Sequence, residues 1–192
     1  MVPPPPESDA AVATVRGYLL SHEGGLSIST ALMGFAVMAV IGFFGLASRR
    51  VGEKAGHGGL ARSAFVVAAS VVVSTTILGV VLQAALVQQI APVGDDSTLS
   101  AAYAVWDRVF HTAPAMGMVV VLISAVAGTR RSSAYPTWLT GTALLAAALT
   151  VIDVAEDLST TGTNLGPLGV VAFALSNTWI VATSVRVLTG RA

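Results

Sequence analysis

The stretch Ala101-Ala-Tyr-Ala-Val-Trp-Asp-Arg-Val-Phe-His-Thr-Ala-Pro114 opens a hydrophobic run that continues to Gly128 and ends at Thr129-Arg130-Arg131. No charged residue lies between His111 and Arg130. A helix needs about 20 mostly apolar residues to cross a bilayer. The stretch therefore predicts a membrane-spanning helix with Asp107, Arg108 and His111 near its first end.

The composition of the whole chain agrees with this prediction. Of 192 residues, 54% are hydrophobic and 10% are charged, and the mean hydropathy is +0.79. Soluble domains carry about 25% charged residues. The formal net charge is zero, so we expect no nucleic-acid partner. The absence of cysteine excludes disulfides, iron–sulfur clusters and cysteine nucleophiles.

Four more segments have the length and apolar character of a membrane span. Because lipid offers no hydrogen bonds to the backbone, the spans must be helical, and the chain is predicted to be an all-α integral membrane bundle. Residues 26–192 form this five-span domain, with spans at about 26–48, 63–90, 101–128, 137–158 and 167–188.

Residues 1–25 are predicted to form a polar, Pro-rich N-terminal tail. Pro3 to Pro6 favour the polyproline II conformation or disorder. Residues 10–20 form either a short helix at the membrane surface or a partly ordered tail. Ser21-His22-Glu23-Gly24-Gly25 is expected to break any helix before the first span.

Charge asymmetry gives the orientation. If residues 49–62, residues 129–136 and the C-terminus share one side, that side holds eight of the ten basic residues. These are Arg49, Arg50, Lys54, Arg62, Arg130, Arg131, Arg186 and Arg191. Short loops rich in Lys and Arg stay in the cytoplasm, so the N-terminus is predicted outside and the C-terminus inside. Aromatic residues expected near the membrane interfaces are Tyr103, Trp106, Tyr135 and Trp138.

Polar residues gather at the outer ends of the third and fourth spans. Asp107 and His111 are four residues apart and share a helix face. Asp153 and Asp157 have the same spacing on the next span, and antiparallel neighbours bring His111 level with Asp153. The predicted outer-leaflet cluster consists of Asp107, Arg108, His111, Asp153, Glu156 and Asp157, with Gln83 at similar depth.

The cluster allows two main interpretations. Ionisable groups inside a span are costly and mark a functional site by default; a buried Asp153 crowded by like charges would act as general acid or base, with His111 as its catalytic partner. Alternatively, a bond from Asp153 to His111 or Arg108 locks two helices, and the remaining carboxylates mark helix ends. Metal ligation is less favoured because there is a single histidine at no recognised spacing. We predict no metal and no cofactor.

Three segments resemble those of uncharacterised small multi-pass membrane proteins of actinobacteria. They are Gly-Phe-Phe-Gly-Leu-Ala at 42–47, Ala-Tyr-Pro-Thr-Trp-Leu at 134–139 and Asn-Thr-Trp-Ile-Val-Ala-Thr-Ser-Val at 177–185. The resemblance implies a multi-pass membrane protein. It implies no mechanism, because that group has no assigned activity.

The sequence thus predicts a small polytopic protein of the bacterial plasma membrane, with an acidic vestibule in the outer leaflet. The leading hypothesis is an accessory subunit or a binder of a lipid-like or cationic ligand. The alternative is an intramembrane enzyme, an isomerase or cyclase acting on a prenyl or lipid substrate, and a transporter is third. Expected partners are the lipid bilayer, other membrane protein subunits or a hydrophobic small molecule.

Overall fold

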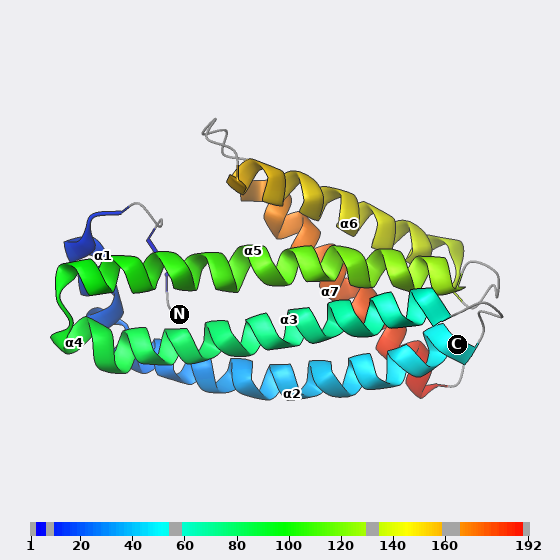
Figure 1. Ribbon diagram of the computed structural model, residues 1–192, viewed down its shortest axis with the longest axis horizontal. Helices are drawn as coiled ribbons and strands as arrows, with labels where there is room; N and C mark the ends of the chain where they lie inside the picture. Colours follow the sequence, from blue (N-terminus) through cyan, green and yellow to red (C-terminus); the bar gives the residue numbers. More distant parts are fainter. Residues whose placement is uncertain (1–2, 7–9, 54–58, 130–134, 159–165, 190–192) are drawn as a thin grey trace. The chain divides into compact units, whose positions relative to one another are not determined.

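The computed structural model describes residues 3–6, 10–53, 59–129, 135–158 and 166–189. Every regular element in these ranges is a helix (Figure 1). In chain order they are α1 (Val12–Ser21), α2 (Glu23–Glu53), α3 (Gly59–Ala85), the π-helical turn η1 (Leu86–Ile90), α4 (Ala91–Val93), α5 (Asp96–Thr129), α6 (Thr137–Leu158) and α7 (Gly166–Leu188).

Among the described residues, five helices are long and apolar enough to cross a membrane. They cover Glu23–Arg49, Gly59–Val93, Asp96–Thr129, Thr137–Glu156 and Leu168–Leu188. The predicted all-α architecture with five membrane-length helices is confirmed, and it marks the chain as a multi-pass membrane protein. The first span differs in its start, because Gly24 and Gly25 are already helical in α2 and only His22 separates α1 from α2.

The chain forms two compact units, and α2, α3 and α5 each contribute to both. The first unit comprises residues 1–40 and 73–113. Val15 and Leu19 lie four residues apart on one face of α1, and both are buried. They belong to an apolar core with Leu26, Leu86, Val87, Ala91, Leu99, Tyr103 and Trp106. Helix α1 is therefore a packed element of this unit.

Polar contacts of Arg16 fix the middle of α1 near the turn between α4 and α5. The Arg16 guanidinium donates to the carbonyl oxygens of Ala91 and Gly94, and it forms an ion pair with Asp96 at 2.9 Å. Just before this turn, η1 widens the helix so that the Ala91 N–H bonds to Leu86. Pro92 follows directly, and a proline ring disfavours the ordinary helical bond to the carbonyl four residues back.

The second unit comprises residues 41–72 and 114–192. Within it, α6 and α7 run side by side in opposite directions (Figure 1). Trp179 of α7 is fully buried and makes edge-on ring contacts with Phe43 and Tyr135. A Cβ added at Gly117 would lie 2.7 Å from Val72 Cγ2. Helix α5 thus approaches α3 closely through a residue that has no side chain, as is common in membrane bundles.

Candidate functional site

An aromatic-lined cavity of about 310 Å³ lies in the first unit. Its walls come from the N-terminal prolines and from α1, α2, α3, η1 and α5. The lining residues are Pro3, Pro4, Pro5, Tyr18, Leu19, Leu26, Ser29, Met33, Gln83, Leu86, Tyr103, Trp106, Phe110 and His111. Mainly apolar walls with a few polar groups are typical of small-molecule sites.

Helix α5 supplies an aromatic stripe to this cavity. Tyr103, Trp106 and Phe110 follow one another at three- and four-residue spacing and therefore share a helix face. The Trp106 and Phe110 rings are stacked with centroids 5.6 Å apart. Phe110 packs on α3 at Gly79, where an added Cβ would lie 2.6 Å from Phe110 Cδ2. The missing side chain at Gly79 thus sets the position of one aromatic wall.

Two of the lining residues, Gln83 and Trp106, carry buried polar groups. Gln83 is 5% exposed, and its Nε2 donates to Thr30 Oγ1 at 3.1 Å, which fixes the amide between α2 and α3. Trp106 is 8% exposed, and its Nε1 is buried with no hydrogen-bond partner among the described residues. A buried donor left unpaired costs about 1–3 kcal/mol. An acceptor atom that came within hydrogen-bond distance of Nε1 would remove that cost.

The predicted pair of Asp107 and His111 borders the same cavity. Asp107 Oδ1 lies 3.0 Å from His111 Nδ1, with the Asp107 side chain 28% and the His111 side chain 55% exposed. His111 lines the cavity and meets the Phe110 ring edge-on at 5.4 Å between centroids. Of the predicted site residues, Gln83 and His111 therefore line the cavity, and Asp107 contacts His111 without lining the cavity itself.

The other predicted site residues lie elsewhere. Arg108 is exposed on α5 and is not among the lining residues. Asp153 and Glu156 are half-buried on α6 of the second unit. Asp157 belongs to α6, but its side chain lies outside the described residues. The predicted pairing of His111 with Asp153 joins residues of different units and stays a prediction. Within the described part of the chain, no three His, Asp or Glu side chains gather as metal ligands.

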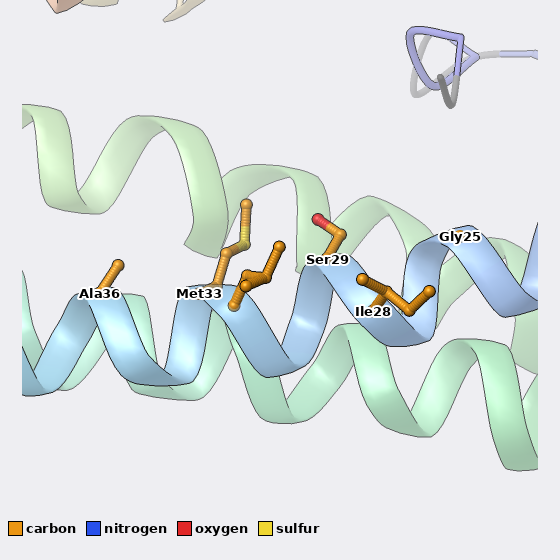
Figure 2. A pocket seen from close by; sticks show the side chains of 6 residues that line it. Gly25, Ile28, Ser29, Met33 and Ala36 are labelled. Carbon is orange, nitrogen blue, oxygen red and sulfur yellow. The ribbon is translucent and has the colours of Figure 1, made fainter.

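A shallow apolar groove runs along α2 beside the cavity. Figure 2 shows its lining side chains along one side of the helix. The groove has a volume of about 370 Å³ and is lined by Gly25, Ile28, Ser29, Leu32, Met33 and Ala36. Ser29 and Met33 line both the groove and the cavity. The two hollows therefore adjoin each other at Ser29 and Met33.

The aromatic wall and the prolines were not predicted as site residues. Tyr103 and Trp106 were predicted to lie near a membrane interface, and the structure buries both side chains within the protein. Their helical spacing with Phe110 was the available signal.

Comparisons with protein-family models, curated proteins and solved structures found no match. The cavity and the groove are therefore the features from which a function can be inferred.

Proposed function

We propose that this membrane protein binds an amphiphilic lipid, with the polar end in the aromatic cavity and the hydrocarbon chain in the α2 groove. The indole N–H of Trp106, which is buried and has no hydrogen-bond partner in the described part of the chain, carries the proposal. Trp106 lines a cavity whose other walls are mostly aromatic and aliphatic. A ligand with an apolar body and one acceptor oxygen complements both properties.

The dimensions of the hollows support a chain-bearing ligand. The cavity volume of about 310 Å³ is at the lower end of the range for small-molecule sites, so it suits the polar end rather than a whole lipid. The groove extends from Gly25 to Ala36, which at 1.5 Å per residue corresponds to about 16 Å of helix. Ile28 and Leu32 are 65% and 63% exposed there and offer an apolar bed for a chain.

The aromatic faces also suit a cationic headgroup. Quaternary ammonium groups bind against the faces of Trp, Tyr and Phe rings, and Tyr18, Tyr103, Trp106 and Phe110 all line the cavity. Asp107 adds a carboxylate that contacts His111 at the edge of the cavity. A choline-type lipid would therefore place its cation on the rings and an ester or phosphate oxygen at the indole N–H.

The membrane and orientation belong to the same proposal. We place the protein in a bacterial plasma membrane, with the N-terminus and residues 92–100 outside and the C-terminus in the cytoplasm. The segregation of basic residues supports this orientation. The cavity then opens to the outer leaflet. The resemblance to actinobacterial multi-pass proteins fits this placement.

Thermal unfolding with added lysophosphatidylcholine tests the proposal. The wild-type protein should gain stability with lipid concentration, because a ligand that binds only the folded state stabilises it. Trp106→Phe removes the indole N–H and should weaken binding by roughly tenfold, the equivalent of one hydrogen bond. Trp138→Phe is the matched control, since Trp138 is 56% exposed on α6 and lies outside the cavity.

The outcomes separate the proposal from nonspecific detergent effects. Ligand-free Trp106→Phe should unfold close to the wild-type temperature, because lost packing is offset by removal of an unpaired donor. A lipid-induced shift that is unchanged in Trp106→Phe contradicts the proposed site. Equal weakening in Trp138→Phe also contradicts it, since the effect would then report general lipid contact.

A further inference from the structure

The N-terminal prolines are held by two tyrosine hydroxyls from different helices. Tyr18 of α1 donates to the Pro3 carbonyl at 2.9 Å, and Tyr103 of α5 donates to the Pro6 carbonyl at 2.6 Å. Pro3, Pro4 and Pro5 line the aromatic cavity together with these tyrosines. The segment thus forms one wall of the cavity and is bound at both of its ends.

The two accepting carbonyls are three residues apart in the sequence, which is one turn of a polyproline II helix. A run of four prolines favours polyproline II, which has three residues per turn and a rise of about 3.1 Å. Carbonyls three residues apart then project in the same direction, about 9 Å from each other. Pro3 and Pro6 have this spacing. Prolines have no N–H, so a binding site can form hydrogen bonds with the backbone of such a segment only through its carbonyl oxygens.

We infer that Tyr18 and Tyr103 form a recognition site for the polyproline II conformation, and that the Pro3–Pro6 segment of this chain is its ligand. Aromatic-lined grooves bind such segments because the peptide is preformed and loses little entropy on binding. The inference is independent of lipid binding, since it concerns the contacts of the segment with the two tyrosines.

Burial of Tyr103 distinguishes recognition from incidental contact. Tyr103 is 2% exposed, and the Pro6 carbonyl accepts its hydroxyl proton. The contact also joins residues 97 positions apart in the sequence, so chain connectivity does not impose it. Both hydroxyls contact backbone atoms, so a separate peptide with the same carbonyl spacing should satisfy them equally well.

A labelled peptide, Val-Pro-Pro-Pro-Pro-Glu, which copies residues 2–7, tests the inference by fluorescence anisotropy. In the wild-type protein the tethered segment competes at a millimolar effective concentration, and binding should be weak. The full-length variant Pro3→Gly/Pro4→Gly/Pro5→Gly/Pro6→Gly lacks the preformed competitor, and it should bind the peptide saturably. A peptide with four glycines in place of the prolines should not bind.

Tyrosine variants in the fourfold-glycine background identify the site. Tyr18→Phe and Tyr103→Phe should each lower peptide affinity by roughly tenfold, because each removes one hydrogen bond. Tyr135→Phe makes the same change in the second unit and should leave binding unchanged. Absence of peptide binding to the folded fourfold variant overturns the inference. Affinity that is insensitive to both Tyr18→Phe and Tyr103→Phe does so as well.

A spin label gives a second measurement in case the fourfold variant does not fold. The chain has no cysteine, so Pro4→Cys carries a single nitroxide. The nitroxide should be immobilised in the otherwise wild-type chain and more mobile when Tyr103→Phe is added. Equal mobility in both proteins would show that the Tyr103 hydroxyl does not hold the segment, which is contrary to the inference.

Discussion

The carboxyl group of Asp153 on α6 lies directly against Gly169 in the first turns of α7. A Cβ added at Gly169 would lie 2.5 Å from Asp153 Oδ1 and 2.9 Å from Cγ. The acidic side chain therefore fills the space that a side chain at position 169 would need. Helix N-termini carry partial positive charge, so the same position also favours the carboxylate electrostatically. Asp153 is thus a packing element of the α6–α7 pair.

Gly169→Ala should destabilise the protein by about 1–3 kcal/mol, the usual cost of overpacking. Rotation of the carboxylate alone does not clear the contact, because Cγ is also too close. In the Asp153→Ala background the same change should become neutral or stabilising, since alanine is the better helix former. Reversible unfolding in mixed micelles measures all four proteins. Equal effects in both backgrounds would refute the packing relationship.

Two controls belong to this cycle. Gly141→Ala changes a glycine of α6 that has open space around its Cβ position, and it should be neutral or stabilising. Asp153→Asn keeps the shape of the side chain and removes its charge. Near-normal stability of Asp153→Asn together with loss of a measurable catalytic activity would favour the alternative in which Asp153 is a general acid.

Arg16→Ala should lower stability by about 2 kcal/mol, the range of hydrogen bonds that involve a charged group. The guanidinium contacts two carbonyl oxygens of the α4 region as well as Asp96. Asp96→Asn should cost less than about 1 kcal/mol, because its side chain is 79% exposed and surface ion pairs contribute little. Chemical unfolding measures both. A loss of stability in Asp96→Asn as large as that in Arg16→Ala would show that the ion pair contributes more than the hydrogen bonds to the carbonyl oxygens.

Asp95 should make stability depend on pH in the acid range. The Ser97 hydroxyl, followed by the Thr98 N–H and hydroxyl, lowers the pKa of Asp95 to about 2, from about 3.9 in an unfolded chain. Because the folded pKa is depressed, this stabilisation is complete above about pH 4 and is lost as pH falls through the folded pKa of about 2. Asp95→Asn removes the titrating group. The free energies of unfolding of the two proteins, measured between pH 2 and 5, should therefore converge as the pH falls. A difference that stays constant over this range would contradict the assignment.

Gly79→Ala should displace Phe110 and reduce lipid binding. An added Cβ would lie 2.6 Å from Phe110 Cδ2, so the ring must shift, at a cost of about 1–3 kcal/mol. The lysophosphatidylcholine-induced rise in unfolding temperature should shrink as well. Gly34→Ala, where no atom lies within 4 Å, is the control on α2. If the lipid-induced rise in unfolding temperature is normal in Gly79→Ala, the position of Phe110 does not affect lipid binding.

Single cysteines test the orientation, since the natural chain has none. Ser100→Cys and Thr189→Cys place thiols at exposed positions near the start of α5 and after α7. In intact cells a membrane-impermeant maleimide should label Ser100→Cys alone. Thr189→Cys should react after the membrane is permeabilised. The reverse pattern would place the N-terminus in the cytoplasm.

Much of the helical architecture could be predicted from the sequence. The predicted second span, 63–90, lies within the observed helical run Gly59–Val93. The observed run extends beyond the predicted end of the span and includes Pro92, a residue type that usually ends a helix. The π-helical turn at Leu86–Ile90 lets the helix continue to Val93. A local bond pattern of this kind is not readable from composition, because proline itself predicts a break.

The site could be predicted only in part. The four-residue spacing of Asp107 and His111 indicated a shared face, and their side chains are 3.0 Å apart. Gln83 was placed at the depth of the cluster, and it lines the same cavity as His111. The prolines were not predicted as cavity-lining residues, because their contacts with Tyr18 and Tyr103 span 15 and 97 residues. Contacts of that range depend on how helices pack.

The sequence by itself determined the class of molecule and the number of membrane-length helices. Both follow from apolar length, because every backbone group inside lipid must bond within its own helix. The tertiary structure alone determined which side chains meet. It set Asp153 against Gly169, Phe110 against Gly79 and Tyr103 against Pro6. In lipid these pairings arise from close packing and hydrogen bonds between helices. The hydropathy of the sequence predicts neither of these.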